Sequence, residues 1–251
     1  MKSFNQELKS ALVAEIRKHR EHDQVIQGSY GTLGDPSGLF RGCAVGCAID
    51  SLFMVNGYYT PENCYADHGI YERELGIPSI LAELQDVIHE GLSDEIFPTW
   101  PERFMEAVPT ETDLSLVFPK FALWFLTDEK FGIFNYSIGT PPQEAVEEAA
   151  ELFSAIVAGE RIPLQVWRDC AEVARRGRSC AAASNDKTTP ARAVSQLLSA
   201  YNGSSGMERR YLSIALALDI AEELHVEKYH TSYYEKCAEK LIELLKAEGN
   251  G

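Results

Sequence analysis

The sequence contains no long hydrophobic run. Although 45% of its 251 residues are hydrophobic, no stretch approaches the roughly 18 consecutive apolar residues that a membrane-spanning helix requires. The first twenty residues are polar and periodic, unlike the apolar segment of a secretory signal. We therefore expect a protein that works in the cytoplasm and has no membrane partner.

Cysteine is scarce and scattered. The six cysteines have wide, irregular spacings that match no zinc-finger framework: Cys43, Cys47, Cys64, Cys170, Cys180 and Cys237. A chain of this size buries roughly three-quarters of the surface that its unfolded form exposes, so its stability requires neither a disulfide nor a structural metal. Because the cytosol is reducing, we expect free thiols, and we predict no cofactor.

Positive charge is also in short supply. The net charge is −15, and the excess lies in residues 61–160, which carry twenty acidic and only four basic side chains. Binding to nucleic acid depends on neutralising phosphates, so this negative charge disfavours nucleic-acid binding. It favours basic partners or cations instead. Solubility is the simpler explanation of the same charge.

No segment has a convincing strand pattern. Apolar residues instead recur every three to four positions, which predicts an all-α protein of about nine to eleven helices in an irregular bundle, not a solenoid. The longer expected helices cover residues 3–22, 41–56, 62–76, 78–90, 163–176, 190–201, 207–224 and 232–247. Gly177 is expected to end the helix that begins near Pro163. We expect one helical domain over residues 1–251, or a division near 202–206 that separates a two-helix unit at 207–248.

Several short motifs carry a resemblance. Residues 41–47 are RGCAVGC, after QGSY at 27–30, and further motifs are YERELGIP at 71–78, WPERFM at 100–105 and the final helix from Tyr234. Together they resemble a group of uncharacterised bacterial and bacteriophage proteins. The resemblance implies a phage or mobile-element setting, and hence the cytosol of a host cell, but no activity.

A second similarity is local. The pattern Arg41-Gly-x-x-x-Gly-x-Ala-x-Asp50 resembles the opening helix of ADP-ribosylglycohydrolases, which are also all-α. Those enzymes hold magnesium through paired aspartates, and this sequence contains no Asp-Asp pair. The pattern therefore does not assign the chain to them.

The residues around Arg41 form one candidate site. A glycine-rich loop that leads into a helix offers backbone amides and the positive helix end to an anion, and Arg41 beside Gly42 could clamp a phosphate or carboxylate. The run matches neither the P-loop nor the dinucleotide fingerprint. The alternative is that these glycines serve helix packing and a tight turn.

Cys43 and Cys47 form another candidate site. Residues four apart share a helical face, so the two thiols could bind a soft metal together with Cys64 or His68. Cys43 at a helix N-terminus could instead act as a nucleophile if His68 or Asp50 approached it. Cysteine is also among the most buried residues, so plain packing explains the pair as well.

Two further pairs have metal-ligand spacing. His68 and Glu72 are spaced i, i+4, which suits a metal or an acid–base pair but equally an exposed pair on a helix. His19 and His22 lie three apart at the end of the first expected helix, where a metal could bridge them. The helix dipole favours cationic side chains there in any case.

The leading hypothesis from these observations is a non-enzymatic binding or interaction protein of the phage type. It would act through its acidic surface at residues 61–160 against a basic protein, or through a small anionic ligand near Arg41. We expect no direct contact with nucleic acid, and a homo-oligomer is compatible with this hypothesis.

Two alternatives belong to other classes. One is a hydrolase or transferase, with Cys43 or Cys47 acting beside His68. In another form of this alternative, the enzyme would depend on a metal held by His68, Glu72 and Asp50. The last alternative is a structural component of a virion.

Overall fold

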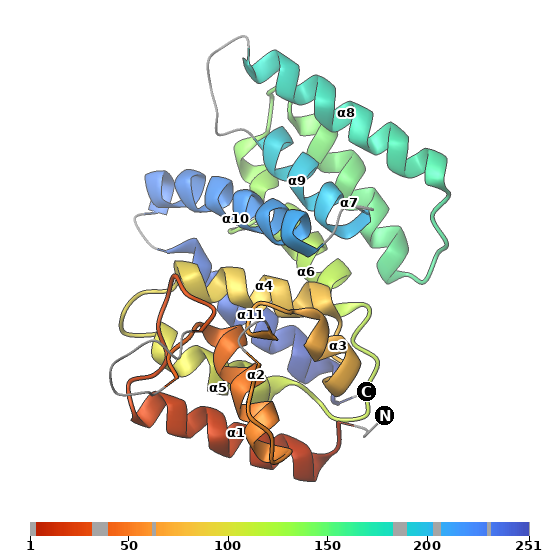
Figure 1. The fold of residues 1–251 in the computed structure, drawn as a ribbon. Coiled ribbons are helices and arrows are strands. Elements are labelled where there is room, and N and C mark those ends of the chain that lie inside the picture. The colour runs from red at the N-terminus through yellow and green to blue at the C-terminus, as the bar shows by residue number, and fades with distance from the viewer. Residues whose placement is uncertain are drawn as a thin grey trace. The chain divides into compact units, whose positions relative to one another are not determined.

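The computed structural model describes residues 4–31, 40–61, 64–182, 190–202, 207–229 and 232–250. Within these ranges the chain forms eleven α-helices and no β-strand, which confirms the predicted all-α class (Figure 1). None of the described helices is both long enough and apolar enough to cross a bilayer.

The helices group into two compact units. The first unit comprises Met1–Leu114 and Ala238–Gly251, and the second comprises Ser115–Cys237. The division that the sequence suggested near residues 202–206 falls inside the second unit, and residues 203–206 lie outside the described ranges.

The first unit contains the N-terminal helices. They are α1 (Gln6–Glu21), α2 (Ala44–Val55), α3 (Gly69–Leu75), α4 (Ser79–Gly91) and α5 (Trp100–Ala107), with a 3-10 turn at Phe97–Thr99 and most of α11 (Tyr233–Glu248). α1 begins after Asn5, whose side chain accepts a hydrogen bond from the backbone N–H of Leu8. Its apolar stripe is buried, as an amphipathic helix against a core requires: Leu12, Val13 and Ile16.

The small residues at the start of α2 pack against a loop rather than against a second helix. The sequence leaves open that the glycines serve helix packing, and in the structure the backbone of residues 24–31 lies against them. A Cβ at Gly46 would lie 1.6 Å from the carbonyl oxygen of Tyr30, and one at Gly42 would lie 2.6 Å from the same oxygen. The glycines of the RGCAVGC motif therefore allow a main chain to approach α2 closely.

α4 is buried on all sides over much of its length. From Leu81 to His89 every residue is buried, and this run includes four polar side chains: Glu83, Gln85, Asp86 and His89. A buried polar group left without a partner costs about 1–3 kcal/mol. The polar residues of α4 therefore need partners inside the first unit.

The second unit contains α6 (Val117–Thr127), α7 (Gln143–Val157), α8 (Leu164–Ala182), α9 (Pro190–Asn202) and α10 (Met207–Tyr229), with a 3-10 turn at Ile133–Tyr136. Aromatic contacts join four of these elements. Tyr201 stacks on Phe118 and on Trp167 and meets Phe153 edge to face. Such contacts add to the burial of apolar surface that stabilises this unit.

α8 corrects one expectation. The sequence predicts that Gly177 ends this helix, but the helix continues to Ala182. A Cβ at Gly177 would lie 2.9 Å from the Cβ of Ala191 at the start of α9. The glycine therefore serves close packing of two helices, which a single sequence cannot distinguish from a helix stop.

Candidate functional site

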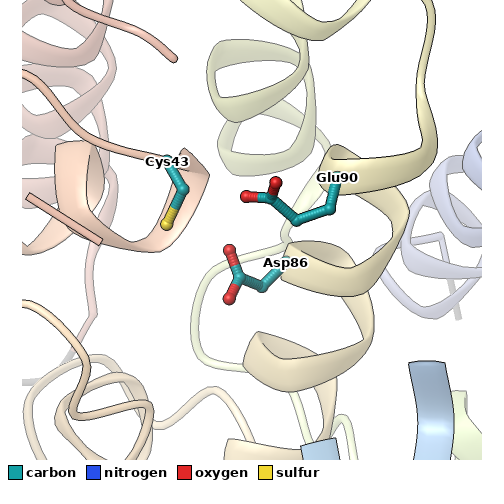
Figure 2. Close-up of side chains that lie close together, drawn as sticks. All are labelled: Cys43, Asp86 and Glu90. Carbon is teal, nitrogen blue, oxygen red and sulfur yellow. The ribbon is translucent and has the colours of Figure 1, made fainter. Parts of the chain in front are cut away.

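Three side chains from two helices converge in the first unit. Asp86 and Glu90 lie one turn apart on the same face of α4, and Cys43 is the N-cap residue of α2. The sulfur of Cys43 and one carboxylate oxygen each from Asp86 and Glu90 all lie within 4.8 Å of one another. Figure 2 shows the carboxylates of Asp86 and Glu90 extending from neighbouring turns of α4 toward Cys43. We call these residues the Cys43 cluster.

Backbone contacts hold Cys43 in place. Its backbone N–H donates to the carbonyl of Ser29 at 2.7 Å, and its side chain is almost completely buried. Its extended φ and ψ start α2, so the positive end of the helix dipole faces the two carboxylates. The loop and α2 together therefore fix the thiol opposite α4.

The two carboxylate oxygens of Asp86 have different partners. Its Oδ2 lies 3.0 Å from Nε2 of His68, the residue that precedes α3, and both side chains are buried. Its Oδ1 is buried and meets no donor at normal hydrogen-bond geometry among the described residues, but the Cys43 thiol is close enough for a side-chain hydrogen bond to Asp86 that raises the pKa of the thiol. A buried carboxylate oxygen beside so weak a donor is costly and calls for a proton or a cation.

Glu90 is half-buried and is tied to the loop before α2. Its Oε2 accepts a hydrogen bond from the backbone N–H of Gly28 at 2.6 Å. Beside it, Nε2 of Gln27 donates to the carbonyls of His89 and Leu92, at 2.7 and 2.9 Å. The QGS segment thus fastens the C-terminal end of α4 to the loop that also holds Cys43.

The electrostatics of the Cys43 cluster favour an added positive charge. Burial raises the pKa of the Cys43 thiol well above its usual range, and the charge of Asp86 raises it further. Burial also raises the pKa of Glu90, to about 7. Because like charges oppose one another's ionisation, three acidic groups this close together ionise together only beside a cation.

The same geometry argues against an activated nucleophile. A reactive thiolate needs a lowered pKa and a neighbouring cation or base. Here the thiol faces two carboxylates, and Nε2 of His68 is directed to Asp86. Cys43 is therefore better suited to be a metal ligand than to attack a substrate.

The other residues of α2 named from the sequence lie elsewhere. Cys47 packs with Val25, Phe40 and Tyr65 in a small core cluster, and its sulfur is 3.3 Å from the carbonyl of Gly42. Burial raises its pKa to a value typical of an inert thiol. Asp50 follows one turn further along α2 and is not among the converging ligands.

The remaining predicted residues are separate from the Cys43 cluster. Glu72 accepts a hydrogen bond from the backbone N–H of Ser79 at 3.2 Å, which satisfies the start of α4. Arg41 is exposed, and part of the loop before it lies outside the described residues. The described cysteines are free thiols: Cys43, Cys47, Cys64, Cys170 and Cys237. Of the predicted site residues, the structure brings Cys43 and His68 together, and it does so around Asp86.

Asp86 and Glu90 were missed by the sequence analysis. A signal was present, because they form an acidic i, i+4 pair in a segment whose other positions are largely apolar, LAELQDVIHEGL. Two carboxylates on the face of a buried helix are unusual enough to suggest a metal or proton site.

The chain was compared with models of protein families, with curated proteins and with solved structures, and none of the three gives a match.

Proposed function

We propose that the protein is a metal-dependent hydrolase whose divalent ion is bound by Cys43, Asp86 and Glu90. The observation that carries the proposal is that three ligand atoms, one each from Cys43, Asp86 and Glu90, all lie within 4.8 Å of one another, with two of the three side chains buried. This is the metal-dependent form of the enzyme hypothesis, with a different ligand set.

The ligand chemistry favours zinc or a similar transition metal. Magnesium and calcium take oxygen ligands, whereas thiolate with carboxylates suits a borderline ion such as Zn²⁺. His68 contacts the Asp86 carboxylate and so fixes its orientation, as residues that contact metal ligands commonly do.

Three protein ligands and an open side favour catalysis over a purely structural ion. Structural zinc sites are usually closed by four protein ligands, and catalytic sites keep one position for water. Glu90 is only partly buried, so its side of the Cys43 cluster is the one from which a water molecule would approach the ion. A divalent ion there would supply a Lewis acid and lower the pKa of a water molecule.

Metal content tests the first half of the proposal. The full chain is dialysed against Co²⁺ and the near-ultraviolet sulfur-to-cobalt absorption is recorded. We expect one ion per chain and loss of the band in Cys43→Ser, with Cys64→Ser as the matched control. Glu90→Gln should weaken binding at least tenfold. A full complement of Co²⁺ in Cys43→Ser would exclude the site.

A small chelating ligand tests the second half. Acetohydroxamate added to the Co²⁺ protein should change its visible spectrum, because a hydrolase needs an open position on its ion. If the spectrum stays the same while Co²⁺ remains bound, the ion is structural and the hydrolase assignment fails.

The leading sequence hypothesis gains no support from the geometry. The acidic residues of 61–160 are divided between the two units, and some of them, such as Asp86 and Glu102, are buried. The start of α2 beside Arg41 faces the carboxylates of the Cys43 cluster. Their negative charge disfavours the binding of an anionic ligand there. The phage setting stays a prediction.

A further inference from the structure

A pocket of about 570 Å³ lies between α1 and α2, apart from the proposed metal ligands. One wall is a single face of α1, and the opposite wall is the C-terminal half of α2. The segment after α2 closes one end. The residues that line it include Lys18, His19, Asp50, Met54, Tyr58 and Tyr59. Pockets of this volume are typical of small-molecule sites.

The floor of the pocket carries a carboxylate held by neutral groups. Asp50 Oδ1 accepts a hydrogen bond from Thr60 at 2.8 Å and lies 3.4 Å from the Tyr65 hydroxyl. Nε2 of His19 lies 3.5 Å from Oδ2. Burial lowers the pKa of His19, so the imidazole is neutral near pH 7. Asp50 therefore has no lysine or arginine partner among the described residues.

The rim is aromatic and exposed. Tyr59 is 99% exposed, Tyr58 is 68% exposed and Met54 is 54% exposed. Exposed large apolar side chains are common singly, but here three of them border the same cavity. Aromatic faces attract organic cations, and the negative end of the α1 dipole acts in the same direction.

We propose that this pocket binds a small organic cation, an amine with an apolar body, whose ammonium group approaches Asp50 while its body packs against Tyr58 and Tyr59. The basic groups of the pocket do not offer an anion a better site. Lys18 lies at the rim and pairs with Glu15, and His22 is engaged with the carbonyl of Lys18 at 2.7 Å. The apolar rim in turn disfavours a hydrated inorganic cation.

Three probes of the same shape test the charge requirement. Calorimetry with the full chain compares phenethylamine with the neutral 2-phenylethanol and with the anionic phenylacetate. We expect phenethylamine to bind at least tenfold more tightly than either. Equal affinity for all three, or no binding of phenethylamine at millimolar concentration, would overturn the proposal.

Variants locate the binding. Asp50→Asn should weaken phenethylamine binding at least tenfold. If that variant does not fold, Tyr59→Ala decides, because the side chain is exposed and its loss leaves the core intact. We expect at least a threefold loss in Tyr59→Ala and none in Leu212→Ala, an exposed residue of the second unit. Unchanged affinity in Tyr59→Ala would contradict this assignment. Cys43→Ser should bind the amine normally, so this proposal is independent of the metal.

Discussion

At the scale of single residues, Gly46 occupies the most restrictive position in the RGCAVGC motif. An alanine Cβ there would lie 1.6 Å from the Tyr30 carbonyl oxygen, which is main chain and has little freedom to move. We expect Gly46→Ala to lower the free energy of unfolding by more than about 3 kcal/mol, at the upper end of overpacking effects. Urea unfolding would measure this.

Gly57→Ala is the control for Gly46. Gly57 has a positive φ of 79°, but no atom of the described residues lies within 4 Å of an added Cβ. Its substitution should cost only about 1–2 kcal/mol of backbone strain. Equal losses of unfolding free energy in the two variants would mean that the contact with Tyr30 adds nothing to the cost of Gly46→Ala.

His19 predicts how stability depends on pH. Its pKa is lowered by burial, so the folded protein binds a proton there less readily than the unfolded chain. Stability is therefore full above the unfolded pKa of about 6.5 and falls as pH decreases toward the folded pKa, by at most about 1.4 kcal/mol per pH unit. Between pH 7 and pH 5, the free energy of unfolding should fall less in His19→Gln than in the native chain. Equal losses of stability between the two pH values in His19→Gln and in the native chain would contradict the assignment.

At the scale of helices, Glu102 links α5 to α1. Its oxygens lie 2.6 Å from Nε of Arg17 and 3.0 Å from Nε of Arg20, and its side chain is only 12% exposed. Thr99 and Glu102 have the spacing of a capping box, but Thr99 Oγ1 donates to the carbonyl of Ile96 instead. A glutamate with tertiary arginine partners is thus unavailable as a local cap.

Replacing Glu102 should weaken the contact between α1 and α5. We expect Glu102→Ala to reduce the free energy of unfolding by about 1–3 kcal/mol, because charged hydrogen bonds in a partly buried place are lost. Glu106→Ala is the matched control, since Glu106 is half exposed and contacts Arg17 at 3.2 Å; it should cost less than about 1 kcal/mol. Chemical denaturation of both variants checks this, and a larger loss for Glu106 would be contrary to the structure.

At the scale of the whole chain, metal binding should act on one unit. An ion that binds only the folded state adds about 2.7 kcal/mol of stability at a hundredfold excess over its dissociation constant. We expect Zn²⁺ to slow amide hydrogen exchange in residues 40–55 and 79–91 and to leave α7 and α9 unchanged. Mass spectrometry of the peptides, with and without a chelator, would show this. Protection spread evenly over both units, or persisting in Cys43→Ser, would argue against the site.

The helical class and most helix positions follow from the sequence alone. Apolar residues three and four apart form a stripe on a helix whatever the chain does elsewhere. α1 was therefore predictable from residues such as Leu12 and Ile16, and α4 and α9 from stripes of the same kind. The cysteine and charge counts likewise needed no structure.

Only the tertiary structure decided what the special residues do. Gly177 and Gly46 look like other glycines in the sequence, and their roles depend on Ala191 and Tyr30, which are distant in the chain. Asp86 and Glu90 become a candidate site because α2 brings Cys43 to them. Local periodicity is encoded by neighbouring residues, whereas a converging ligand set depends on how separate helices pack, and one sequence does not reveal that packing.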